Sequence, residues 1–140
     1  MTTNVLILCT HNSARSQMAE ALLRQFGGAR FDVYSAGTEA TRVHTLAVRA
    51  MAEVGIDISA ARSKSLTEFL DEHYDYVITV CDAASESCPN FPGAPERIHW
   101  SLPDSSAVTG PEDERLRAFA RVRDDIAERL RAWTALPQNA

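Results

Sequence analysis

The feature that most constrains the fold of this 140-residue chain is an apolar run that ends in a cysteine and leads directly into a helical pattern. Residues 5–8 are apolar, residues 9–16 read Cys-Thr-His-Asn-Ser-Ala-Arg-Ser, and Met18, Leu22 and Phe26 then recur every four residues. This pattern predicts a buried strand, a tight loop and an amphipathic helix in succession. Backbone N–H groups at the start of a helix are unpaired and converge, so the loop can bind an oxyanion.

Cys9 and Arg15 make this loop a candidate site for nucleophilic attack on a bound oxyanion. Arg15 lies six residues after Cys9 and can hold two oxygens of an anion with its planar guanidinium. The same positive surroundings favour the Cys9 thiolate, the form that attacks. Asn12 can brace the loop and Ser16 can hydrogen-bond the sulfur. The alternative is a buried strand-end cysteine with a solvated Arg15. The predicted oxyanion-binding residues are Thr10, His11, Asn12, Ser13, Ala14, Arg15 and Ser16.

Strand and helix patterns alternate along the rest of the chain. Further strands are predicted at residues 31–35, 74–80 and 97–100, and helices at 42–54, 66–71 and 112–133, with loops at 82–95 and 103–111. Such alternation predicts a parallel sheet with helices on both faces, within one domain spanning residues 1–140. Ligands of such sheets bind beyond the carboxyl ends of the strands. Cys9, Cys81 and the loop after Trp100 are therefore expected to converge there.

Composition excludes several classes of partner. The formal net charge is −5 and there is no basic cluster, which argues against binding nucleic acid or an anionic membrane. No apolar run approaches the roughly 20 residues that span a bilayer, and residues 1–4 lack the basic start of a signal peptide. Three cysteines cannot form a closed disulfide framework, so we expect a reducing, cytoplasmic setting.

The loop of residues 9–16 resembles that of the low-molecular-weight tyrosine phosphatase superfamily, which includes arsenate reductases built on the same scaffold. The resemblance covers the chain from Val5 to Trp133. It implies a flavodoxin-like, three-layer α/β/α fold, here with a four-stranded parallel sheet. The phosphatase and reductase branches share this loop, so the loop alone does not choose between them.

Asp104 is the candidate general acid. It lies four residues past Trp100, and a thiolate that attacks a tetrahedral oxyanion needs a proton donor for the oxygen that leaves. The position resembles the aspartate loop of the family, although Ser105 replaces the usual proline after the acid. The alternative is an aspartate that only stabilises a turn.

Cys81 and Cys88 distinguish the two branches. Cys81 ends the predicted third strand, and Cys88 lies seven residues further along. A phosphatase needs one cysteine, whereas a reductase must supply two electrons and then be reset. The resemblance to the three-thiol reductases implies that Cys81 attacks the Cys9–arsenic adduct and that Cys88 carries the disulfide outward to thioredoxin. The alternative is a core cysteine at 81 and an incidental loop cysteine at 88.

Other polar residues point to no metal or organic cofactor. The cysteines do not form paired Cys-x-x-Cys clusters, which argues against zinc. In some thioredoxin-coupled relatives a carboxylate at the position of Lys64 helps to bind potassium beside the loop; here the Lys64 ammonium could replace that ion. Three histidines are interpreted as surface or hydrogen-bonded residues rather than ligands or bases: His44, His73 and His99.

Together these features predict a cytoplasmic, monomeric arsenate reductase with arsenate as substrate and thioredoxin as reductant. Cys9 is the predicted nucleophile, Arg15 the anion-binding side chain, Asp104 the acid, and Cys81 and Cys88 the resolving cysteines. One alternative is a low-molecular-weight tyrosine phosphatase, which needs only Cys9, Arg15 and Asp104. Another is a non-catalytic oxyanion-binding or redox-sensing module.

Overall fold

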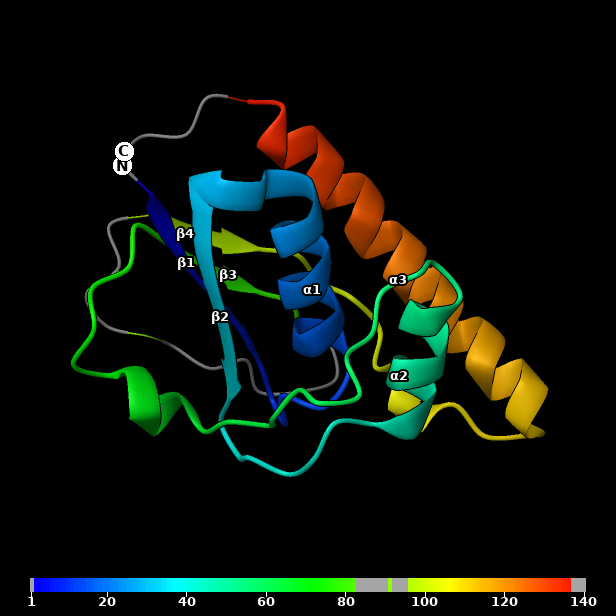
Figure 1. The fold of residues 1–140 in the computed structure, drawn as a ribbon. Coiled ribbons are helices and arrows are strands. Elements are labelled where there is room, and N and C mark those ends of the chain that lie inside the picture. Colours follow the sequence, from blue (N-terminus) through cyan, green and yellow to red (C-terminus); the bar gives the residue numbers. More distant parts are fainter. Residues whose placement is uncertain (1, 83–90, 92–95, 137–140) are drawn as a thin grey trace.

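Four parallel strands form one sheet in the order β2-β1-β3-β4. The structure is a computed structural model that describes residues 2–82, 91 and 96–136 (Figure 1). The strands are β1 (Thr3–Cys9), β2 (Phe31–Gly37), β3 (Tyr76–Thr79) and β4 (Glu96–His99). The predicted four-stranded parallel sheet of an α/β fold is confirmed.

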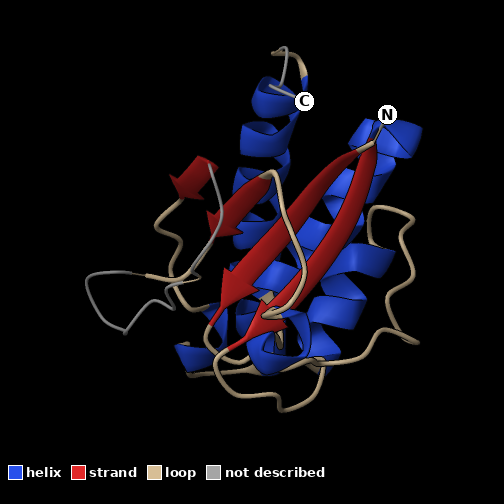
Figure 2. Ribbon diagram, turned by 90° about the vertical axis from the view of Figure 1, so that its left-hand side faces the viewer, coloured by secondary structure: helices blue, strands red, loops and turns tan. Residues whose placement is uncertain are grey.

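The helices are distributed unequally over the two faces of this sheet. The helices α1 (Arg15–Gly27), α2 (Thr45–Ala52) and α3 (Glu112–Thr134) pack together on one face, around a core that includes Ile7, Leu23, Met51 and Phe119 (Figures 1 and 2). On the other face, within the described residues, Leu66 and Phe69 of the 3-10 helix η2 (Leu66–Phe69) pack against a second, smaller core. Helical structure therefore lies on both faces, but the three α-helices of the described residues all lie on one.

Two short 3-10 helices, η1 (Gly28–Arg30) and η3 (Ser105–Ala107), complete the described helical elements. Several predicted boundaries differ from the structure. The helix expected at 42–54 covers only Thr45–Ala52, because the His44 side chain accepts a hydrogen bond from the Leu46 N–H and so begins the helix there. The strand expected at 74–80 is limited to Tyr76–Thr79.

The order of the strands determines where a site can form. The chain moves from β1 outward to β2 and then returns across β1 to β3, so a switch point lies between β1 and β3. Ligands of open parallel sheets bind at the carboxyl ends of the strands beside such a point. The connection between α2 and η2 runs along this same edge in Figure 1. None of the helices in the described ranges is both long enough and apolar enough to cross a bilayer.

Candidate active site

Cys9 is the last residue of β1 and lies at the base of the loop that leads to α1. It is 2% exposed, and its sulfur lies 2.8 Å from the hydroxyl of Ser16 and accepts the N–H of Asn12 at 3.3 Å. The N-cap residue of helix α1 is Ala14, which supplies no side-chain cap, and the first turn has no acidic residue. Most helices satisfy their first N–H groups with such a cap, so this end of α1 suits an anionic ligand.

Asn12 holds the loop in shape. It is fully buried and has a φ of 50°, a conformation that asparagine tolerates better than most residues. Its amide nitrogen donates to the hydroxyls of Ser16 at 2.8 Å and Ser35 at 2.9 Å. Its amide oxygen accepts from Gln17 Nε2 and from the Lys64 backbone N–H, both at 2.8 Å. All four hydrogen-bonding positions of the side chain are therefore used.

The end of β2 lies against the backbone of the loop. Gly37 pairs with Cys9 in the sheet, and a Cβ atom there would lie only 2.7 Å from Asn12 N and Thr10 O. Glycine therefore permits the close approach. Gly37 is a part of the site that was not predicted from the sequence. Its only mark in the sequence is its place shortly after the second predicted strand.

The connection after α2 supports the same loop from outside. The hydroxyl of Ser63 donates to the His11 carbonyl oxygen at 3.0 Å, and Gln17 Nε2 donates to the Arg62 carbonyl oxygen at 2.9 Å. The predicted loop residue His11 is itself half exposed, and its Nε2 lies 3.8 Å from a carboxylate oxygen of Glu39. Gln17 and Ser63 were not predicted as site residues, because no local pattern marks contacts across 45 to 52 residues.

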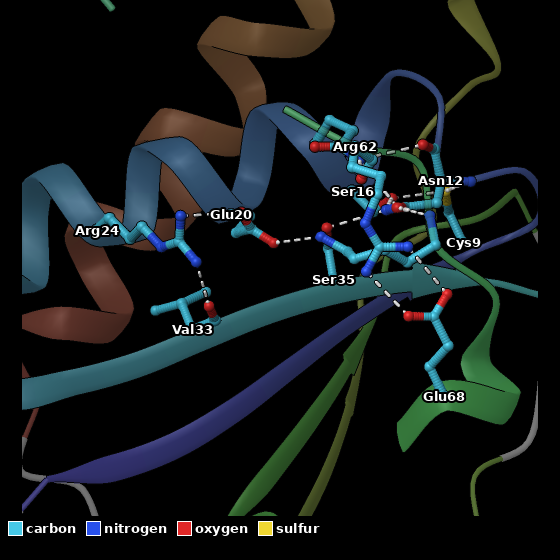
Figure 3. A network of polar contacts seen from close by, with 11 residues as sticks. Cys9, Asn12, Ser16, Glu20, Arg24, Val33, Ser35, Arg62 and Glu68 are labelled. Atoms are coloured by element: carbon cyan, nitrogen blue, oxygen red, sulfur yellow. Dashed lines mark hydrogen bonds and ion pairs between the residues drawn. The ribbon is translucent and has the colours of Figure 1, made fainter. Parts of the chain in front are cut away.

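Lys64 pairs with Glu20, and Figure 3 shows Glu20 between Arg24 and the loop residues Asn12 and Ser16. Its ammonium lies 3.3 Å from Glu20 Oε1, and Arg24 lies 3.1 Å from the other oxygen of the same carboxylate. The side chains of Lys64 and Glu20 are only 14% and 9% exposed. The carboxylate is therefore compensated by two cations of this chain. Within residues 2–82, 91 and 96–136, no three His, Cys, Asp or Glu side chains are grouped so as to hold a metal ion.

Arg15 and Asp104 are brought together by the loop after β4. The guanidinium of Arg15 is almost fully buried, donates from Nη1 to the Leu102 carbonyl oxygen at 3.1 Å, and places Nη2 4.0 Å from Asp104 Oδ1. The Asp104 side chain is 29% exposed. A cation for an oxyanion and a carboxyl group that can exchange protons with water thus face one another at the carboxyl edge of the sheet.

His44 connects α2 to the loop. Its backbone N–H donates to the Ser13 carbonyl oxygen at 2.9 Å, and its ring Nδ1 accepts from the Leu46 backbone N–H at 3.0 Å. Burial, followed by the nearby charge of Arg115, lowers the pKa of His44 below 6.5, while Asp104 acts in the opposite direction. His44 is therefore neutral at pH 7, and its expected role as a hydrogen-bonded residue fits this geometry.

Cys81 follows β3 and is fully buried. The hydrogen bond from Val80 N to Leu8 O, at 2.9 Å, continues the pairing of β3 with β1 to the residue before Cys81. Cys9 and Cys81 therefore lie at the ends of neighbouring strands. Cys9 is a free cysteine, whereas Cys81 is disulfide-bonded. Cys88, the second predicted resolving cysteine, lies outside the described residues.

Comparisons with known proteins agree with this arrangement. Residues 4–139 match the model of the family described as low molecular weight phosphotyrosine protein phosphatase. An arsenate reductase of Halalkalibacterium halodurans is 43% identical over 129 residues, which cover 92% of this chain and 93% of the relative. A solved arsenate reductase in its phosphate-binding state is 35% identical, with a TM-score of 0.79 over 96% of this chain and 98% of that one.

The reductant is stated in the name of a third similar protein. The thioredoxin-dependent arsenate reductase of Corynebacterium glutamicum is 30% identical, with a TM-score of 0.63 over 94% of this chain and 63% of that chain.

Proposed function

The chain belongs to the low molecular weight phosphotyrosine protein phosphatase family, and on this premise we propose that it is an arsenate reductase that uses three cysteines and is reset by thioredoxin. The proposal rests chiefly on the two buried cysteines at the ends of the neighbouring strands β1 and β3. Hydrolysis of a phosphate ester needs only one cysteine, Cys9. Reduction of arsenate needs two electrons, which a second thiol at this position can help to supply.

In the proposed first step, arsenate binds to the N–H groups of the loop and to Arg15. The Cys9 thiolate, held by Ser16 and Asn12, forms a bond to arsenic while one arsenic–oxygen bond breaks. The departing hydroxyl takes a proton from Asp104 and leaves as water. Arg15 and the helix N-terminus stabilise the negative charge throughout this step.

In the second step the Cys81 thiolate attacks the sulfur of Cys9. The sulfur–arsenic bond breaks and its electron pair stays on arsenic, which leaves as arsenite, while Cys9 and Cys81 form a disulfide. Cys88 then attacks Cys81 and releases the Cys9 thiolate, and thioredoxin reduces the remaining disulfide. A disulfide that contains Cys81 but not Cys9 is compatible with the state after this exchange.

The main competing function is hydrolysis of phosphate esters, since Cys9, Arg15 and Asp104 would suffice for it. The competing non-catalytic function, oxyanion binding or redox sensing, would need no turnover.

We further propose that the protein acts as a monomer in the cytoplasm, because the relay requires a compartment that reduces disulfides.

A coupled assay distinguishes these functions. Purified protein is mixed with arsenate, thioredoxin, thioredoxin reductase and NADPH, and arsenite release is followed together with NADPH oxidation; a parallel reaction replaces thioredoxin with glutaredoxin. Repeated turnover with thioredoxin is expected. Hydrolysis of an aryl phosphate without release of arsenite would favour a phosphatase, and neither reaction would favour a non-catalytic module.

A further inference from the structure

The two carboxylate oxygens of Asp104 have different surroundings. Oδ1 accepts hydrogen bonds from the backbone N–H of Ser106 at 3.0 Å and from its hydroxyl at 2.5 Å. The same oxygen is the one that faces Arg15 Nη2, at 4.0 Å. Oδ2 makes no hydrogen bond or ion pair with any side chain or backbone group in residues 2–82, 91 and 96–136.

This difference determines which oxygen can carry the acidic proton. A carboxyl oxygen offers about two lone-pair positions, and both positions of Oδ1 are directed to donors on Ser106. A proton on Oδ1 would therefore displace one of these hydrogen bonds, whereas a proton on Oδ2 displaces none. The protonated acid thus has its proton on Oδ2, with Oδ1 as the acceptor.

We propose that Ser106 is a positioning residue, which holds Oδ1 of Asp104 and so leaves Oδ2 to deliver the proton to the departing oxygen. The inference rests on the proposed function, because it concerns the proton that forms water from the arsenate hydroxyl. In that step the Oδ2–H bond breaks, the departing oxygen gains the proton, and Asp104 is left as a carboxylate with Ser106 still bound to Oδ1.

The neighbouring Ser105 shows why the hydroxyl of Ser106 carries this role. Ser105 stands where the family usually has a proline, which would make the loop rigid. Its hydroxyl is buried and has no hydrogen-bond partner among the described residues, so it does not hold the acid. A helix cap at Asp104 requires only the Ser106 N–H. The additional bond from the Ser106 hydroxyl fixes the carboxyl group and compensates for the absent ring.

Three variants test this inference in the full-length protein: Ser106→Ala, Ser106→Thr and the matched control Ser105→Ala. At saturating arsenate, Ser106→Ala should slow the first turnover of arsenite release by about tenfold, the size expected for one lost hydrogen bond to a charged group. Inhibition by phosphate and the KM for arsenate should stay within about twofold, since Arg15 and the loop are untouched. Ser106→Thr keeps the hydroxyl and should restore the rate.

A spectroscopic measurement makes the test independent of activity. The carboxyl carbon of Asp104, labelled with carbon-13 and assigned with Asp104→Asn, should shift at pH 7 in Ser106→Ala but not in Ser105→Ala. An equal loss of rate in both alanine variants, or an unchanged rate and resonance in Ser106→Ala, would overturn the inference. If the wild type released no arsenite at all, the proposed function would fail, and the resonance would still decide whether Ser106 holds the acid.

Discussion

The hydroxyl oxygen of Ser16 is hydrogen-bonded to the sulfur of Cys9. The two atoms lie 2.8 Å apart, and the same hydroxyl oxygen accepts a hydrogen bond from Asn12 Nδ2 at 2.8 Å. Since Asn12 supplies its own proton to Ser16, the hydroxyl proton of Ser16 is available to the sulfur. We infer that the sulfur accepts from Ser16 as well as from the Asn12 N–H, and hydrogen bonds of this kind favour the negative charge of an attacking sulfur.

Replacing Ser16 should therefore slow the reaction of Cys9 with electrophiles. In a background where Cys81 and Cys88 are serine, Ser16→Ala should lower the rate of alkylation by iodoacetamide at pH 7 by about tenfold, as expected for one lost hydrogen bond to an anion. The exposed Ser59→Ala is the matched control and should react like the background. An unchanged rate in Ser16→Ala would mean that Ser16 does not stabilise the sulfur.

Gly37→Ala should damage the loop by crowding its backbone. The new Cβ would lie 2.7 Å from both Asn12 N and Thr10 O, so the loop must move, at a cost of about 1–3 kcal/mol in the free energy of unfolding. Phosphate binding, followed by calorimetry, should weaken at least about tenfold as the N–H groups lose alignment.

Gly28→Ala is the control for this experiment, because Gly28 has a positive φ and lies away from the loop with open space around its Cα. It should also lose about 1 kcal/mol of stability, but it should retain phosphate binding. Equal weakening of binding in both variants would contradict the crowding explanation.

Local sequence patterns predict some features of the site, whereas contacts between distant segments leave no such pattern. The strand, loop and helix around Cys9 could be predicted because their pattern lies within about twenty neighbouring residues, and Asp104 could be predicted from its place after a strand. The contacts of Gly37 with the loop and of Arg15 with the Leu102 carbonyl join segments that no local pattern connects. The predicted start of α2, at residue 42, is wrong because histidine is an unusual capping residue and His44 was not expected to begin the helix.

Turnover should be insensitive to potassium. The Lys64 ammonium already compensates Glu20 at 3.3 Å, in the place where some relatives use the ion. Rates in potassium and sodium buffers of equal ionic strength should agree for the wild type. Lys64→Ala should lower the free energy of unfolding by about 1 kcal/mol, since Arg24 still pairs with Glu20. A large gain specific to potassium in the wild type would mean that Lys64 does not replace the cation.

Stability should fall as the pH drops below 6.5, partly through His44. Its pKa is lowered in the folded state, so the unfolded chain binds the proton more readily. The contribution of neutral His44 to the free energy of unfolding is complete above pH 6.5. It is lost as the pH falls through the lower pKa that His44 has in the folded state. Protonation of Nδ1 also removes the cap on Leu46.

Urea unfolding at pH 7.5 and pH 5.5 measures this effect. His44→Asn keeps a capping side chain that does not titrate and should show a smaller loss of stability between the two pH values than the wild type. His73→Asn, at an exposed position, should behave like the wild type. An equal loss in the wild type and in His44→Asn would remove His44 as the cause.

The order of the three cysteines is the central claim, and the number of arsenite molecules released per enzyme tests it most directly. Thioredoxin, its reductase and NADPH are present throughout. Cys9→Ser should release none, and Cys81→Ser should release little while arsenic stays bound to Cys9. Cys88→Ser should release one arsenite and stop, with a Cys9–Cys81 disulfide visible by peptide mass mapping. Continued turnover by Cys88→Ser at the wild-type rate would contradict the relay.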